Sequence, residues 1–467
     1  ETMGSTPTAI LAAAALLAAC GTSSGNEDAS EDPAPDVVTD VTEEADPDVP
    51  GDVAEEETPR DCTMPSPSEQ EALDDEVHAY IVTDDDSLLT RLDADLCFEA
   101  FAQAIRAPQP ADDPSPGVIA TSFPYASSSA TLHLWVSSTA VLDGSTRVPL
   151  IVWLHGAGDS GANNINSTTL RGAADSLGGI LAVPTSTSTC DWSASDVCAA
   201  LVHNTVRKVK REYPIDDDRV YITGFSMGGR GSYTDGLTWP DMFAGVAPIA
   251  GTIGACHGTL DLATHAAYIT PHIENARHQR VRLLTGLMDN EYLVAQNEAA
   301  SGVFDSLGYD FVWDALAGVG HSFPQAQWTS AMSWLSEHSR DPYPPDVLYN
   351  MAWHASSYYE NLFMNNTLNT NVFWVRIDSR ISSTEAGRVD ASIDGQTISA
   401  TTENIVQLSV YLADELIDLD SPVTITINGS TWYEGLVERS PSLALRHAKE
   451  RQERTMVFAA RIQDMVP

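Results

Sequence analysis

The chain is short of positive charge. Its 467 residues include 24 lysines and arginines against 66 aspartates and glutamates, which gives a formal net charge of −42. Nucleic-acid binding needs a basic surface that neutralises phosphates, and docking on anionic lipid by charge needs one as well. The composition therefore argues against both kinds of partner.

A hydrophobic run long enough to cross a bilayer is also missing. The apolar stretch at residues 10–19 is too short for that role and is typical of a targeting segment. It ends in Leu17-Ala18-Ala19-Cys20-Gly21, which resembles the lipobox of bacterial lipoproteins. We therefore expect residues 1–20 to be a signal peptide and Cys20 to be lipidated. The exported protein would sit at the outer membrane, at the cell surface or in the periplasm. A plain secretory signal is the alternative.

The six cysteines lack the spacing of a zinc site. Because export exposes a protein to a compartment that permits disulfides, we expect pairing instead. Cys190 and Cys198 flank a short loop, and Cys62 and Cys97 are the next plausible pair. Cys256 is then left unpaired.

Residues 21–61 are rich in Asp, Glu, Pro and Thr and almost free of aromatic side chains. Such a composition cannot bury enough apolar surface to fold, so the sequence predicts a disordered acidic stalk. Calcium binding is the alternative, but the carboxylates lack the EF-hand spacing and its glycine. We expect neither a metal nor a cofactor.

The next 280 residues or so carry two patterns. Residues 62–117 combine a helix-capping signal with apolar spacing and predict helices, with one at 88–105. Residues 118–341 alternate strands with helices, which predicts a mostly parallel sheet covered on both faces. The segment from 251 to 278 is expected to be an irregular insert.

The prolines at residues 342–345 mark a change of pattern. Short alternating strands with Asp-Gly and Asn-Gly turns follow, so residues 342–467 predict a small antiparallel β domain. Its strands are expected at 372–377, 389–393, 406–412, 423–427 and 456–462, with one helix at 442–454.

One stretch organises the rest of the chain. An apolar run that starts at Val220 leads into Gly224-Phe225-Ser226-Met227-Gly228, the Gly-x-Ser-x-Gly pattern of a nucleophile elbow. In this strand-to-helix turn the serine has a strained backbone conformation, and the backbone segments on the two sides of the turn lie very close together. Gly224 and Gly228 lack the Cβ atoms that would clash there. Ser226 is therefore the predicted nucleophile.

A serine hydroxyl needs a histidine base, which in turn is held in one tautomer by a carboxylate. On this architecture the partners follow in the order Ser, Asp, His, at the carboxyl ends of strands. Asp289 and His321 each follow a predicted strand and meet that requirement. Asp310 and Asp314 are rival acids, although both lie in or beside a strand.

Acyl transfer also needs N–H donors for the developing oxyanion. The residue after the nucleophile, Met227, supplies one of them. The second comes from the small-residue loop 155–161, which follows an apolar strand. We expect Ala157 to be that donor, with Gly158 as the neighbouring alternative.

With these motifs the chain resembles the α/β-hydrolase superfamily. It is most similar to the exported esterases grouped with polyhydroxybutyrate depolymerases and feruloyl esterases. The resemblance covers about residues 118–340 and rests on the loop 155–161, the elbow 224–229, the segment 243–251, Asp289 and Gly320-His321. It implies an α/β-hydrolase fold and ester hydrolysis through a Ser-His-Asp triad and an acyl-enzyme. Depolymerases of this kind often carry a cysteine in the oxyanion loop, and Ala157 departs from that pattern.

The sequence thus predicts an exported, lipid-anchored hydrolase of carboxylic esters. Polymeric esters, such as a polyester or a plant polysaccharide ester, are a substrate class that the resemblance leaves open. A serine peptidase of the same fold is one alternative, but the propeller that normally accompanies it is not visible. A non-catalytic surface-binding lipoprotein is the other, although every triad residue is present. Aromatic candidates for the pocket are Trp192, Trp239, His257, Tyr268 and Trp353.

Overall fold

The computed structural model describes residues 62–83, 85–92, 96–125, 128–186, 192, 196–253, 262–351, 369–382 and 385–467. The predictions for the signal peptide, Cys20, the stalk and Cys256 lie outside the described residues, as do Cys190 and the side chain of Cys198 that were expected to pair. No helix among those described is both long and apolar enough to span a membrane.

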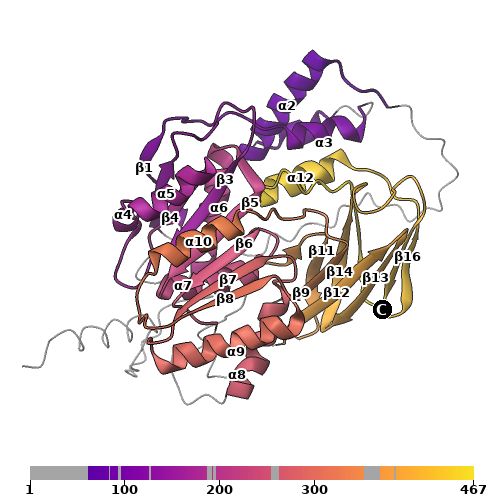
Figure 1. Ribbon diagram of the computed structural model, residues 1–467. Helices are drawn as coiled ribbons and strands as arrows, with labels where there is room; N and C mark the ends of the chain where they lie inside the picture. Colours follow the sequence, from indigo (N-terminus) through magenta and orange to yellow (C-terminus); the bar gives the residue numbers. More distant parts are fainter. Residues whose placement is uncertain are drawn as a thin grey trace, which may run out of the picture.

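An eight-stranded sheet organises the first region of the molecule, which runs from residue 117 to residue 340 (Figure 1). Its strands are β1 (Gly117–Tyr125), β2 (Ser128–Val136), β3 (Val148–Leu154), β4 (Ile180–Pro184), β5 (Ile215–Phe225), β6 (Gly245–Ile249), β7 (Arg280–Gly286) and β8 (Phe311–Leu316). They lie in the order β1-β2-β4-β3-β5-β6-β7-β8. Strand β2 runs antiparallel to both neighbours and all other pairs are parallel. This architecture is the predicted α/β-hydrolase fold.

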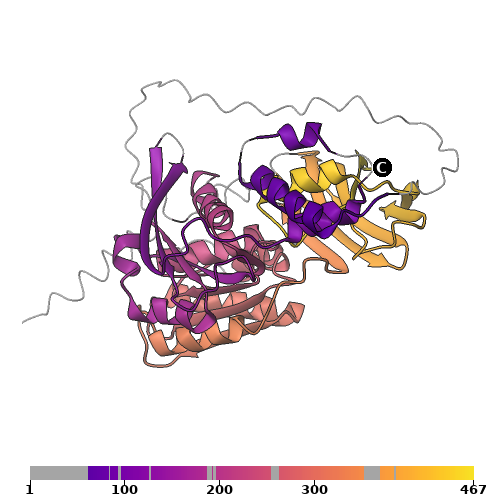
Figure 2. The same ribbon diagram turned by 90° about the horizontal axis from the view of Figure 1, so that it is seen from above.

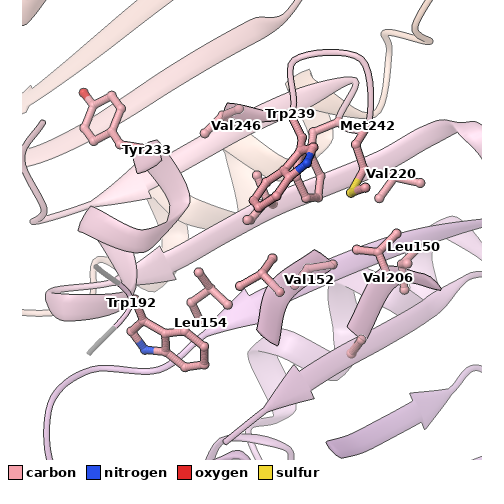
Figure 3. Packing of buried hydrophobic residues seen from close by; sticks show 14 of the residues in the cluster. Leu150, Val152, Leu154, Trp192, Val206, Val220, Tyr233, Trp239, Met242 and Val246 are labelled. Carbon is pink, nitrogen blue, oxygen red and sulfur yellow. The ribbon is translucent and has the colours of Figure 1, made fainter. Parts of the chain in front are cut away.

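Helices cover both faces of this sheet because side chains of the buried strands alternate between two hydrophobic clusters. Leu150 and Val152 of β3 face one cluster, part of which Figure 3 shows, and Ile151 and Trp153 face the other. The first cluster takes side chains from α6 (Asp196–Glu212), α7 (Met227–Thr238), α8 (Leu262–Glu274) and α9 (Glu291–Leu307). The second takes them from α5 (Thr168–Leu177) and α10 (Gln325–Leu335). A short helix, α4 (Gly161–Asn164), follows β3.

Two helix predictions are wrong in detail. The segment 251–278, expected to be irregular, contains α8. The helix expected at 88–105 is instead a short 3-10 turn at Ser87–Thr90 and a separate helix α3 (Phe98–Arg106). The backbone of Cys97 is extended at the start of α3, so one continuous helix cannot pass through it.

The N-terminal helices pack against the end of the chain rather than against the large sheet. Helix α2 (Pro67–Val82) and α3 share a buried cluster with α12 (Pro441–Arg451), in which Val77, Phe101 and Leu445 take part. Figure 2 shows these helices over the C-terminal region. The predicted disulfide between Cys62 and Cys97 is confirmed.

Two small sheets form the C-terminal region. One contains β10 (Asn371–Val372), β11 (Val375–Arg380), β14 (Ile405–Leu412) and β17 (Ala460–Met465), and the other contains β9 (Asp346–Met351), β12 (Gly387–Asp394), β13 (Thr397–Glu403), β15 (Val423–Ile427) and β16 (Ser430–Gly435). Their pairs are antiparallel, as predicted, except that β13 and β15 run parallel. The predicted boundaries at residues 117/118 and 341/342 stay predictions.

The strand expected at 372–377 is a tight hairpin instead. Phe373 has a φ of 49° and its N–H donates to Oδ2 of Asp241 at 2.8 Å, a carboxylate that lies after α7 of the first region. The last strand begins at Ala460 rather than at residue 456, because Met456 and Phe458 turn into the C-terminal core.

A buried ion cluster joins the two regions. The guanidinium of Arg340 donates to Asp218 of β5 at 2.6 Å and to Glu453, which follows α12, at 3.1 Å. Lys210 of α6 pairs with Asp217 at 2.8 Å and lies 3.7 Å from Glu453. The C-terminal region is thus tied to the large sheet by charges withdrawn from water.

Candidate active site

The elbow between β5 and α7 has the strain that its sequence pattern predicts. Ser226 has φ 59° and ψ −115°, a backbone conformation that few side chains tolerate. A Cβ on Gly228 would lie 1.9 Å from the carbonyl oxygen of Leu154, and one on Gly224 would lie 2.4 Å from the oxygen of Gly228. The predicted requirement for glycine at both positions is confirmed.

Three predicted side chains meet at the carboxyl edge of the sheet. Nδ1 of His321 lies 2.8 Å from Oδ2 of Asp289, and its Nε2 lies 2.8 Å from Oγ of Ser226. The Asp289 side chain is 1% exposed, whereas that of His321 is 27% exposed. A buried carboxylate thus orients an imidazole that solvent and a substrate can reach.

The loops after β7 and β8 hold Asp289 and His321 in register. The N–H of Met288 donates to the carbonyl of Val319 at 2.8 Å. A Cβ on Gly286 would lie only 2.5 Å from the same Val319 oxygen, so the two loops approach too closely for any other residue there. The distance between acid and base is therefore set by backbone contacts rather than by the side chains alone.

The rival acids are engaged elsewhere. Asp310 pairs with Arg280 at 2.7 Å, and Asp314 pairs with Arg282 at 2.7 Å. Both arginines belong to β7, which pairs with β8. Asp314 lies in β8, and Asp310 immediately precedes it. Of the three aspartates considered from the sequence, Asp289 is the one hydrogen-bonded to His321.

The peptide between Gly156 and Ala157 borders the nucleophile. A Cβ on Gly156 would lie 3.7 Å from the Cβ of Ser226, so the loop passes directly over the elbow. Met227 is the first residue of α7, where a backbone N–H has no acceptor within the helix. Met227 follows Ser226 in the chain, and Ala157 follows Gly156, which borders Ser226. Their role as oxyanion donors stays a prediction. Gly158, the alternative, has a φ of 76° and shapes the turn.

His155 holds that loop in place, a role that the sequence reasoning missed. The N–H of Ser186 donates to Nε2 of His155 at 3.0 Å, so Nδ1 carries the proton and donates to the carbonyl of Gly156 at 2.8 Å. Burial lowers the pKa of His155 and keeps this neutral tautomer. Because the peptide group is planar and trans, the N–H of Ala157 points away from the ring. The position of His155 immediately before the glycine was the available signal.

Aromatic side chains pack against the imidazole of His321. The rings of Phe225 and His321 lie 5.2 Å apart, and Phe323 packs between Phe225 and Trp153. Sequence reasoning did not assign a role to either phenylalanine, although both are near neighbours of triad residues in the chain.

Three exposed apolar side chains, Leu287, Met288 and Tyr292, form the apolar rim close to Asp289 in the sequence. Met288 is 72% exposed, and Leu287 and Tyr292 are also exposed, all within a few residues of Asp289. These side chains leave apolar surface in contact with water close to Asp289 in the chain.

Two of the predicted pocket aromatics, Trp192 and Trp239, are core residues instead. Trp192 is buried and donates to the carbonyl of His155, and Trp239 is buried and stacks on His203. Both belong to the core because their large apolar rings fill the space between helices and sheet. His257, Trp353 and the side chain of Tyr268 lie outside the described residues.

The comparisons with known proteins point to one class. No family model matches the chain. It is 30% identical over 135 residues to feruloyl esterase B of Neurospora crassa, covering 26% of this chain and 44% of that protein. It is 25% identical over 230 residues to a probable carboxylesterase SOBER1-like of Arabidopsis thaliana, covering 43% and 84%. Over 53 residues it is 43% identical to poly(3-hydroxyalkanoate) depolymerase C of Paucimonas lemoignei, covering 11% and 13%.

The chain spans less than half the length of the feruloyl esterase that it matches. Two of these relatives are named as esterases and the third as a depolymerase, so the chain is similar to carboxylic ester hydrolases.

Proposed function

We propose that this chain hydrolyses carboxylic esters through a triad of Ser226, His321 and Asp289. One observation carries the proposal: an unbroken line of hydrogen bonds runs from a buried carboxylate through an accessible imidazole to a strained serine. The similarity to ester hydrolases supports the reaction class.

The reaction proceeds in two steps, the acylation of Ser226 and the hydrolysis of the acyl-enzyme. Neutral His321 takes the proton of Ser226 as Oγ attacks the ester carbonyl carbon, and the N–H groups of Ala157 and Met227 stabilise the oxyanion. Asp289 stabilises the imidazolium, which then protonates the leaving alcohol as the C–O bond breaks. Water repeats these steps on the acyl-enzyme and releases the acid, which regenerates the serine.

The apolar rim favours esters that present an aromatic or aliphatic group next to the carbonyl. Burial of Leu287, Met288 and Tyr292 against such a group would remove apolar surface from water on binding. Feruloyl esters and polyhydroxyalkanoate are the chemistries that the names of the relatives suggest. Both fit an apolar rim better than acetate esters do.

A fluorophosphonate probe tests the proposal directly. The parent should be labelled at Ser226, and a panel of p-nitrophenyl acetate, methyl ferulate and a polyester film should then rank its substrates. No labelling and no ester turnover would favour the alternative of a non-catalytic binding protein. Turnover of peptides in preference to esters would favour the peptidase alternative.

We further propose that the protein is exported and anchored by lipid at Cys20. The support is the sequence pattern at residues 10–21 alone. Cys20→Ser should move the protein from the membrane fraction to a soluble fraction. Unchanged association with the membrane would contradict the proposal and direct attention to another anchor.

A further inference from the structure

A small basic pocket lies where the two regions meet. It has a volume of about 20 Å³ and is bordered by the end of α6, the start of β5, α2 and the segment after α12. Four of its lining residues are cationic: Arg147, Lys210, Arg211 and Arg454. Such a concentration of positive charge is unexpected in a chain with a net charge of −42.

The carboxylates of the pocket are already engaged. Asp217 pairs with Lys210 at 2.8 Å, and Glu212 pairs with Lys208. Across the described parts of the chain, no carboxylate lies within ion-pair distance of the other three cations, the guanidiniums of Arg147, Arg211 and Arg454. The guanidinium of Arg147 donates instead to the backbone carbonyl of Arg106.

Two nitrogen atoms of these arginines have no hydrogen-bond partner. Nη1 of Arg454 and Nε of Arg211 are both buried and unpaired within the described residues, while Nη2 of Arg454 contacts Nδ1 of His78 at 3.0 Å. A buried donor without an acceptor costs about 1–3 kcal/mol, and more when it is charged. The site therefore calls for an acceptor that also carries negative charge.

Neighbouring groups respond to this excess of positive charge. Burial and the repulsion of Arg147 lower the pKa of Arg454 to about 10. Burial and Arg454 lower the pKa of His78 to about 4, so this imidazole is neutral at pH 7 and adds no charge. Asp217 attracts both Arg147 and Arg454, but it is also paired with Lys210, so positive charge stays in excess at the pocket.

We propose that this pocket binds a halide ion, with chloride as the natural occupant. The pocket has room for one small ligand. Water would supply an acceptor but no charge, whereas a halide supplies both. The ion bridges Arg147 and Arg211 of the first region to Arg454 of the second, so chloride stabilises the junction. This site is independent of ester hydrolysis.

Thermal unfolding of the full chain tests this binding. Sodium chloride and sodium gluconate are compared at equal ionic strength, because screening alone would affect both alike. Chloride should stabilise saturably; at ten times the dissociation constant the folding equilibrium constant should rise about elevenfold over gluconate. Arg454→Gln and Arg211→Gln should abolish this difference. Equal responses of the parent to the two salts overturn the proposal.

Arg171→Gln is the matched control. Arg171 also has no carboxylate partner among the described residues, but it lies over the Trp135 ring on the surface, away from the pocket. Its variant should keep the chloride response of the parent. Loss of the response in this control as well would show that the effect is not specific to the pocket and would overturn the proposal.

A crystal of the parent soaked in sodium bromide provides a test that needs no variant. An anomalous peak in the pocket, within about 3.5 Å of a guanidinium nitrogen of Arg454, is the expected result. Ordinary density for water without an anomalous signal would overturn the proposal. This measurement decides the question even if the arginine variants fail to fold.

Discussion

The two regions of the molecule differ in where the carboxyl ends of their strands lie. In the large sheet, parallel strands bring their carboxyl ends to one edge, so the loops after β5, β7 and β8 meet and place Ser226, Asp289 and His321 together. In the C-terminal sheets most neighbours are antiparallel, so successive carboxyl ends fall on opposite edges. A composite site assembled from several loops is therefore easier to build in the first region than in the second.

The surroundings of two histidines also differ between the two regions. His321 is 27% exposed and has a hydrogen-bond partner on each ring nitrogen. His447 of α12 is 3% exposed, and neither of its nitrogens has a partner within the described structure. It packs against Tyr411 and Phe458, and burial lowers its pKa to about 3. One imidazole is positioned to move protons, whereas the other acts as a neutral ring of the core.

The largest effect is expected from Ser226→Ala. Turnover should fall on the order of 10⁴-fold or more, because the hydroxyl supplies the attacking atom. Ser409→Ala is the matched control in the C-terminal region, where the buried hydroxyl donates to Asp378 at 2.8 Å. It should keep the turnover of the parent per folded molecule. Activity of Ser226→Ala within tenfold of the parent would contradict the triad.

Asp289→Asn should be nearly as severe. An amide would favour the wrong tautomer of His321, so turnover should fall about 10³- to 10⁴-fold with little change in substrate binding. Asp310→Asn removes a surface partner of Arg280 and should stay near the parent. Both are assayed at saturating ester with folding checked by circular dichroism. The reverse outcome would place the acid on the wrong strand.

Arg340→Met tests the connection between the regions. It leaves the buried Glu453 and the partly buried Asp218 without their guanidinium, so the free energy of unfolding should fall by about 3–5 kcal/mol. Denaturant unfolding measures this loss. The exposed cluster of Arg439 with Asp414 and Asp420 provides the control, and Arg439→Met should cost no more than about 1 kcal/mol. A similar cost for both variants would indicate that the buried cluster does not join the regions.

His447→Phe should make the protein less sensitive to acid. The folded state holds this imidazole neutral down to a pKa of about 3, whereas the unfolded chain takes up a proton below about pH 6.5. Stability contributed at pH 7 is therefore lost as pH falls, by about 1.4 kcal/mol per pH unit between those values.

The variant should show a shallower decline between pH 7 and pH 4 in denaturant unfolding. The decline should not vanish, because burial also lowers the pKa of His203 to about 3 and that of His272 to about 4. An unchanged slope would mean that His447 can be protonated without unfolding.

The smallest effect is expected at the apolar rim. Met288→Ser should lower kcat/KM for aromatic or long-chain esters by about three- to tenfold relative to acetate esters, because one apolar contact is lost. Ile381→Ser is the matched control, since Ile381 is 73% exposed in the C-terminal region and Met288 is 72% exposed. Equal selectivity in the two variants and the parent would remove the rim from substrate binding.

Much of the site could be predicted because its signals are local. The elbow, the acid and the base each follow an apolar strand. Glycine is needed on both sides of Ser226 because a Cβ there would clash with residues a few positions away or in the adjacent strand. The Cys62–Cys97 pair was predicted from spacing and compartment and is present. By contrast, the turn at Phe373 could not be predicted, since an aspartate 132 residues away holds its backbone.

The sequence by itself determined the alternation of strands and helices, the elbow and the order of Ser226, Asp289 and His321, because these depend on periodicity and on short motifs. Only the tertiary structure decided that His155 aims the Ala157 peptide, that the N-terminal helices pack on α12 and that Arg340 joins the two regions. Those contacts link segments that are far apart in the chain or require a defined ring orientation. Their formation depends on strand order and on burial, and no local pattern encodes either.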